Sequence, residues 1–292
     1  SERIIYRGVI DEYTLNFVVV PRINAAGRIA DARHALEFLI SENDVSARNM
    51  LIELNETNRR RQKIEEDIVK EISGSLLDKN LDTRKSIVLY NQNWHLGVIG
   101  IVAQKVMEKF GKPSIILTRV GDYLKGSGRG GDGIDLYDTV SSLSQFLLKY
   151  GGHKFACGIA LAEEKLDLFA NAFEESIKSS TIQRDRAHRV DAHAEFEELT
   201  LDLMEFFEKL SPFGMGNPRP NLMLYPATLS QNNRFIKIAD TNNRVWYGSI
   251  QGHLRDIPQN GPFRIIVTPI LREQRGEQFI HLNIKDILSN QI

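Results

Sequence analysis

Apolar positions in the first quarter of the chain recur at helical spacing. Those of residues 31–40 fall on one side of a helix, which predicts a short amphipathic helix there. A longer helix is predicted from about Val45 to Ser73, with apolar clusters near both ends. Its middle, NETNRRRQK, is polar on every face, so we expect this part to bridge solvent between two packed ends. The alternative is a surface helix with one basic side.

Short apolar runs alternate with apolar helices over residues 86–180. The runs SIVLYN and PSIILTRV are predicted to be strands, because they are short and rich in β-branched residues. The segment between them, GVIGIVAQKVMEKF, is predicted to be a helix. Strands and helices that alternate in this way predict a small layered α/β domain.

Glycine interrupts this pattern twice. The segment YLKGSGRGGDG is predicted to be a strand followed by a glycine-rich loop. The segment LYDTVSSLSQFLLKY is predicted to be a helix that leads to Gly151 and Gly152, where we expect a tight turn with His153 at its mouth. A helix stop followed by a capping histidine is the alternative.

The last hundred residues follow a third pattern. A polar linker and an acidic helix, LTLDLMEFFEKL, precede five short apolar runs that polar turn residues separate. Five short strands of this kind fit a small barrel, and the OB-type barrel is the well-known five-stranded case that binds oligonucleotides.

Composition narrows the class of protein. A length of 292 residues indicates two domains, and 42% hydrophobic with 26% charged residues is ordinary for a soluble globular protein. No apolar run approaches the roughly 20 residues needed to cross a bilayer. The single cysteine, Cys157, cannot form an internal disulfide. We therefore expect a cytoplasmic protein with no membrane partner.

Charge is informative through its distribution. The formal net charge of −1 gives no support for a nucleic-acid partner. From Ser211 to the end of the chain, however, nine Lys and Arg residues stand against five Asp and Glu residues, next to the acidic helix. A locally basic segment of this kind is a modest indication of a polyanion-binding face.

The two glycine-rich segments carry the residue types that a phosphate needs. Ser127 offers a hydroxyl donor, Arg129 a planar cationic fork, and the glycines a close approach to backbone N–H groups. Ligands of open α/β sheets gather at the strand ends, so we expect these groups to meet Gly151, Gly152 and His153 in one crevice. The sequence therefore predicts a phosphate site.

Two further segments are candidates for the same crevice. His95 lies at another predicted strand-to-helix junction, where it forms a possible third wall. Arg22, Asn24 and Arg28 surround a predicted turn, and two arginines beside small residues suit a phosphodiester. A capping or turn role accounts for Asn24 equally well.

Metal ligands are missing from this set. The sequence offers no cluster of Asp and His residues that would hold the metal ions of phosphodiester hydrolysis. Asp132, Asp135 and Asp138 are closely spaced, but we expect them to cap turns or face solvent. The chain thus contains groups for binding a phosphate and lacks those for cleaving it.

Taken together, the motifs resemble the RecJ family of single-strand-specific exonucleases, in the DHH phosphoesterase superfamily. The resemblance implies an α/β DHH-associated domain preceded by a long connecting helix and followed by an all-β OB-type barrel. The motifs that carry it, in chain order, are PRINAAGRIADARHALEFL, NWHLGVIGIVAQK, KGSGRGGDGIDLYD, YGGHKFACGIAL and LSPFGMGNPRP.

The resemblance also implies a division of the chain. Residues 1–30 would be the end of a missing N-terminal DHH domain, with FVVV as its last strand, so we expect a processed or truncated product. Residues 31–80 would be connecting helices, residues 81–182 the DHH-associated domain, and residues 183–292 a helix with the OB-like barrel.

The activity that the family implies is digestion of single-stranded DNA from its 5′ end, in repair and recombination. Mn or Mg would be bound by the absent DHH domain, so we expect no cofactor in this chain and no cleavage by it alone. His153 would lie at the scissile phosphate with Arg129, and repair proteins are possible partners. The substrate-binding residues would be Ser127, Gly151, Gly152, Arg22, Asn24, Arg28 and His95.

The barrel offers a second group of candidates for single-stranded DNA. Its aromatic residues would stack on bases and its basic residues would contact phosphates, although aromatics buried in a core are the alternative. These candidates are Phe235, Trp246 and Tyr247 for stacking, and Arg234, Lys237 and Arg244 for phosphates.

Two other functions remain open at this point. One is a non-catalytic nucleic-acid-binding or assembly module in DNA repair. The other is a related DHH enzyme that acts on oligoribonucleotides, against which the PFGMGNP segment and the barrel argue, because a small substrate needs no such extension.

Overall fold

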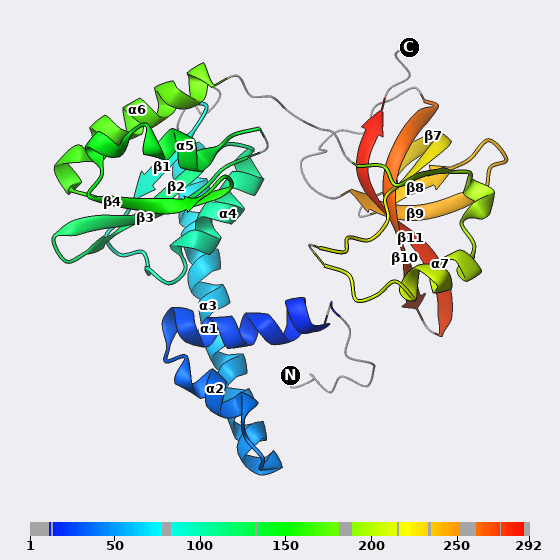
Figure 1. Cartoon of the computed structure of the whole chain (residues 1–292), viewed down its shortest axis with the longest axis horizontal. Coiled ribbons are helices and arrows are strands. Elements are labelled where there is room, and N and C mark those ends of the chain that lie inside the picture. The colour runs from blue at the N-terminus through cyan, green and yellow to red at the C-terminus, as the bar shows by residue number, and fades with distance from the viewer. Residues whose placement is uncertain are drawn as a thin grey trace. The chain divides into compact units, whose positions relative to one another are not determined.

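The computed structural model describes residues 12, 14–77, 83–131, 133–180, 189–214, 216–232, 235–250, 261–274 and 276–288, with the backbone alone at 231, 232 and 235 (Figure 1). Contacts divide the chain into two compact units, one made of residues 13–185 and the other of residues 1–12 with 186–292. No helix in the described ranges combines the length and the hydropathy that a membrane span requires.

The first unit begins with helices. A π-helix, η1 (Thr14–Val19), leads into α1 (Val20–Ile29), α2 (Arg33–Leu39) and the 34-residue α3 (Asp44–Leu77). The strand predicted at residues 17–20 is therefore wrong. Residues 17–19 lie in η1, and Val20 begins α1, where a proline in the first turn suits a helix start and Ala26 packs against α3.

Helix α3 confirms the long connecting helix, but its polar middle is not a solvent bridge. The side chains of Asn58 and Glu65 are 6% and 1% exposed. Glu65 accepts a hydrogen bond from Arg61, 2.6 Å away, and pairs with Lys105 of the neighbouring helix α4 (Ile99–Phe110). Leu54, Asn58 and Glu65 thus form a buried stripe at helical spacing. Paired charges replace the apolar residues that hydrophobic periodicity requires.

The α/β part of this unit is built on a five-stranded sheet of order β1-β2-β3-β5-β4. The β1–β2 pair is parallel, and the other three pairs are antiparallel. The strands are β1 (Ile87–Tyr90), β2 (Ser114–Val120), β3 (Tyr123–Arg129), β4 (Lys149–His153) and β5 (Ala156–Leu161).

Helices cover both faces of this sheet. On one face α4 (Ile99–Phe110) and α3 pack around the buried Ile116. On the other face α5 (Leu136–Ser141) and α6 (Leu166–Ser179) enclose a second core, which the stacked rings of Phe169 and Phe173 fill. Figure 1 shows α5 and α6 beside the strands of this unit. The layered α/β domain is thus confirmed.

Two local predictions within this unit are wrong. The GSGR segment belongs to β3 instead of a loop, because β3 pairs with β2 on one side and with β5 on the other. The helix predicted for residues 136–150 ends at Ser141, and a short 3-10 turn, η3 (Ser144–Phe146), leads into strand β4. The glycines at 151 and 152 consequently lie in an edge strand and not in a turn.

The second unit is a closed barrel. The strand order is β7-β8-β9-β11-β10, and β10 pairs with β7 to close the ring; the short β6 adds to β7 outside it. This is the five-stranded OB-type barrel expected from the sequence. Its elements are β6 (Ala192–Ala194), η5 (Phe196–Glu198), α7 (Leu201–Glu208), β7 (Leu222–Asn232), β8 (Phe235–Ala239), β9 (Val245–Ile250), β10 (Phe263–Gln274) and β11 (Glu277–Leu288).

Candidate functional site

Strand register brings the two glycine-rich segments together. Arg129 of β3, Ala156 of β5 and His153 of β4 are direct cross-strand partners and form one row. Side chains that stand directly opposite in antiparallel pairs share a face of the sheet. Arg129 and His153 therefore lie on the same face, two strand spacings or about 9 to 10 Å apart, with only a methyl group between them.

The neighbouring row on this face carries almost no side chains. It contains Ser127, Gly158 and Gly151, again as direct partners across β3, β5 and β4. The middle of the two rows is therefore almost free of side chains. The Ser127 hydroxyl and the Arg129 guanidinium lie on one side of it, and the exposed His153 imidazole lies on the other.

The Arg129 side chain is held in place by its own strand and by helix α4. Its Nη1 donates to Ser127 Oγ at 3.0 Å and to the Gly128 carbonyl at 2.7 Å. A Cβ at Gly100 would lie 3.2 Å from Ser127 Oγ and 3.3 Å from Arg129 Nη2, so this glycine lets α4 approach closely. The pKa of the Arg129 guanidinium is lowered, chiefly by burial and also by the positive charge of Arg28, whereas Cys157 opposes the shift.

Arg28 and His95 meet at the loop that precedes α4. Arg28 Nη1 donates to the Gly97 carbonyl at 3.3 Å, and the Gly97 N–H donates to His95 Nδ1 at 3.1 Å. A Cβ at Gly97 would lie 1.8 Å from the Arg28 carbonyl oxygen, so only glycine permits this packing. The first turn of α4 has no side-chain cap, and uncapped N–H groups at a helix start attract anions.

The other two residues of the first motif have different surroundings. Arg22 Nε donates to Asn55 Oδ1 at 2.6 Å and its Nη1 to the Val18 carbonyl, so its guanidinium fixes α1 against α3. The pKa of Arg22 is lowered by burial and by nearby Arg59. Asn24 is exposed, one helical turn from Arg28 and on the same side of α1. All three lie on a helix, not around the predicted turn.

The glycines of strands β4 and β5 differ in why they are glycine. Gly152 has a φ of 153°, and a Cβ there would lie 2.2 Å from the Ala156 carbonyl oxygen, so the fold requires it. A Cβ at Gly151 would meet nothing within 4 Å, and one at Gly158 only the Gly151 oxygen at 4.0 Å. Glycine within a strand often marks a close approach by a ligand. The open space at Gly151 and Gly158 fits that explanation.

The donor set of this face suits an anion and does not suit a metal ion. Mn²⁺ and Mg²⁺ prefer carboxylate and carbonyl oxygens. The face offers guanidinium groups, one hydroxyl and imidazoles instead. Across the described ranges, no group of three or more His, Cys, Asp or Glu residues is arranged to hold a metal.

Among the barrel candidates, Lys237 and Tyr247 have exposed side chains on neighbouring strands. Trp246 packs on Phe196 at 4.8 Å between ring centroids and contacts the barrel core, which leaves Tyr247 as the accessible ring. Arg244 is ion-paired with Glu197 and Asp240. Arg234 and the side chain of Phe235 lie outside the described residues.

Comparison with known proteins defines the class first. Residues 83–179 match the DHHA1 domain, and residues 190–286 match the RecJ OB domain. The chain therefore carries a DHHA1 α/β domain followed by an OB-type barrel.

The particular family follows from the relatives. Over 226 residues the chain is 31% identical to the single-stranded-DNA-specific exonuclease RecJ of Bacillus subtilis, and over 216 residues 33% identical to that of Dickeya dadantii. The matches cover 76% and 70% of this chain. The chain is thus a RecJ-like region, related to the RecJ exonucleases. It spans only 29% and 38% of the length of these two relatives.

Solved structures share this fold. The crystal structure of RecJ from Thermus thermophilus in complex with Mg²⁺ shares the fold, with a TM-score of 0.76 and 24% identity, over 97% of this chain and 44% of that one. A crystal structure of exonuclease RecJ bound to manganese matches with a TM-score of 0.50 and 32% identity, over 57% of this chain and 41% of that one.

Proposed function

We propose that this chain is the substrate-binding part of a RecJ-like enzyme that degrades single-stranded DNA from its 5′ end, in DNA repair and recombination in the cytoplasm. The observation that carries the proposal is the register of Arg129 with His153 on one face of the sheet, next to the edge strand β4, which is exposed along its length. The relatives, whose names describe single-stranded-DNA-specific exonucleases, support it.

Each group on this face has a role in the proposal. Arg129, oriented by Ser127, binds a phosphate through charge-assisted hydrogen bonds in a partly buried setting, where such bonds are strong. Arg28 and His95 extend the wall beside it. His153, on the opposite border, contacts the phosphate at which the strand is cut.

The metal ions of cleavage are bound outside these residues in this proposal, by an N-terminal DHH domain. When bound there, Mn²⁺ or Mg²⁺ supplies the activated water and the charge stabilisation that hydrolysis needs. This chain supplies phosphate binding and orientation of the strand. We therefore expect it to bind single-stranded DNA and to cut none by itself.

The test is a titration with fluorescent oligodeoxythymidylates that differ only in a 5′ phosphate. We expect the 5′-phosphorylated strand to bind more tightly and Arg129→Gln to remove that advantage. Arg48→Gln, at an exposed arginine on α3, is the matched control and should change neither affinity.

Equal affinity for both strands in the unaltered protein would contradict the proposal and favour an assembly module in DNA repair. Release of nucleotides from single-stranded DNA by the purified chain with Mn²⁺, lost in His153→Ala, would contradict its predicted inactivity. A preference for short oligoribonucleotides in a competition experiment would favour a related DHH enzyme that acts on oligoribonucleotides.

A further inference from the structure

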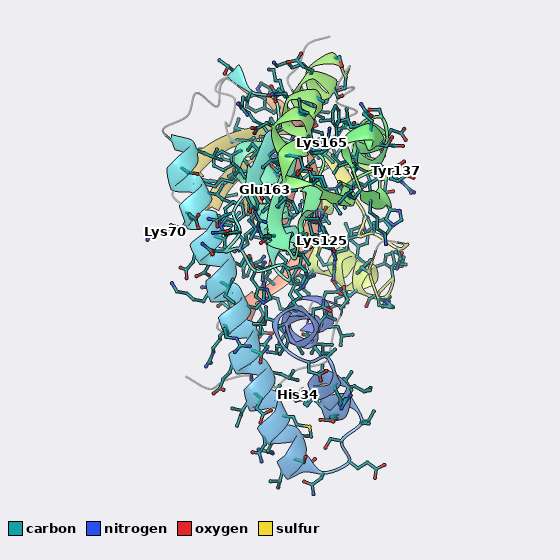
Figure 2. All side chains as sticks on the ribbon, turned by 90° about the vertical axis from the view of Figure 1, so that its left-hand side faces the viewer. His34, Lys70, Lys125, Tyr137, Glu163 and Lys165 are labelled. Atoms are coloured by element: carbon teal, nitrogen blue, oxygen red, sulfur yellow. The ribbon has the colours of Figure 1, made fainter. Side chains whose placement is uncertain are left out.

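The face of the sheet that carries Ser127, Arg129 and His153, here called the candidate face, continues in a third row of residues. Lys125 of β3, Ala160 of β5 and Lys149 of β4 are direct partners, two residues further along than the row of Ser127. Because side chains alternate along a strand, Lys125 lies on the same face as Ser127 and Arg129. Figure 2 labels Lys125 on this unit.

Both lysines present a positive charge at the surface of the sheet. Their residues are exposed, and neither ammonium group bonds or pairs with any residue in the described part of the chain. No acidic residue occupies any of the three rows. By contrast Arg119, near the end of β2, is paired with Glu163.

The spacing of the rows suits an extended strand. Two residues of a β-strand advance about 6.8 Å, so this is the distance from one row to the next. The middle positions of the rows, all Gly or Ala, leave room for a backbone that places phosphates near successive rows.

From this arrangement we infer that Lys125 and Lys149 form a second phosphate subsite, which takes phosphates beyond the one at His153, on a single strand whose terminal phosphate binds at Arg129. The inference rests on the proposed function and extends it. A mononucleotide engages the first subsite alone, whereas an oligonucleotide engages both.

The test compares two ligands on the whole chain, thymidine 5′-monophosphate by NMR titration and a 5′-phosphorylated tetradeoxythymidylate by fluorescence. In the Lys125→Gln/Lys149→Gln variant we expect unchanged affinity for the monophosphate and clearly weaker binding of the tetramer. The slope of log K against log salt should become shallower by about 0.7 for each phosphate that the variant leaves without a cationic partner.

Controls separate the possible outcomes. Lys70→Gln, at an exposed lysine of α3 that Figure 2 also labels, should leave both affinities unchanged. If Arg129→Gln weakens both ligands but the double lysine variant binds the tetramer normally, the second subsite is refuted and the proposed function stands. If Arg129→Gln affects neither ligand, the proposed function fails and the subsite with it.

Discussion

At the scale of single residues, the chemistry of the candidate face lies in three side chains that strand register brings together. Residue type alone points to Ser127, Arg129 and His153, and register places them on one face. Glycine usually indicates a loop, but Gly126 lies in β3. A Cβ at this position would sit 2.9 Å from Leu117, so the neighbouring strand requires glycine here. Packing between strands, which no local pattern reveals, is what selects glycine at that position. The sequence does not single out Lys125 and Lys149 of the third row either. These lysines align with the site only once their segments pair as strands.

The open glycine of the candidate face gives a prediction that separates fold from binding. Gly158→Val should leave the free energy of unfolding unchanged or slightly higher, because valine suits a strand and the position has room. The same change should strongly weaken binding of single-stranded DNA, because the isopropyl group stands where the backbone would pass. Urea unfolding and a fluorescence titration measure the two effects.

Gly152→Ala is the opposite control. Its φ of 153° and the 2.2 Å contact should cost about 1–3 kcal/mol of stability in urea unfolding. Normal DNA affinity in Gly158→Val would refute the close approach that we infer.

The lone thiol gives a second prediction. Cys157 is buried in the α/β core, and burial raises its pKa to about 11, although a backbone hydrogen bond from Gly128 and the charge of Arg129 oppose the shift. Because the thiolate is the nucleophile, iodoacetamide at pH 8 should leave the native protein unmodified and react rapidly in 6 M guanidinium. Mass spectrometry measures both rates, and rapid modification of the native state would count against this burial.

At the scale of elements, a helix or strand is predicted correctly when the sequence pattern that specifies it is local. Helix α3 and the strand β2 are predicted from periodicity and composition, and the structure confirms both. Residues 149 and 150 carry a helical pattern but form β4, because the backbone of Leu148 and the strand pair with β5. The strand predicted at residues 17–20 is replaced by η1 and the first residue of α1, and α1 packs on α3. Contacts between distant segments override local preference in both cases.

One such contact predicts how stability depends on pH. Glu174 of α6 accepts hydrogen bonds from the Ser86 hydroxyl at 2.5 Å and from the N–H groups of Ser86 and Lys85 at 2.9 and 2.8 Å. Burial raises the pKa of Glu174, but these bonds outweigh burial, so the net pKa is lowered. The stabilisation is therefore present above the unfolded-state pKa and is lost as pH falls through the folded-state pKa.

Glu174→Gln should accordingly cost about 1.5–3 kcal/mol at pH 7, the range for hydrogen bonds to a charged group. The difference from the unaltered protein should shrink as the pH falls below about 4.5. Urea unfolding between pH 3 and pH 7 measures it. Glu175→Gln, at an exposed neighbour on the same helix, is the control, and a pH-independent difference would show that the charge is irrelevant.

At the scale of the whole molecule, the order of parts is predictable from the sequence and the closure of the barrel is not. The composition indicates two domains, and five short strands indicate a barrel. Closure depends on β10 pairing with β7, for example Ile265 with Leu224, and no local signal connects residues so far apart. Strand register also depends on pairing between residues that are far apart in the chain. The sequence can therefore indicate candidate site residues, but it cannot show which of them stand opposite one another.

Binding by the whole chain should depend strongly on salt despite a formal net charge of −1. Each phosphate contact on a single strand contributes about −0.7 to the slope of log K against log salt. We expect a clearly negative slope for oligodeoxythymidylates as NaCl rises from about 50 to about 200 mM. A slope near zero would mean that local cations do not drive the association.

The placement of Ser127 and Arg129 in a strand limits how sequences of this kind can diverge. A loop can gain or lose a residue and still present the same groups. In β3 a one-residue insertion or deletion would turn every later side chain to the opposite face, sending the guanidinium into the apolar core beside Cys157. Length in this segment should therefore be held more rigidly over evolution than the identity of its outward residues.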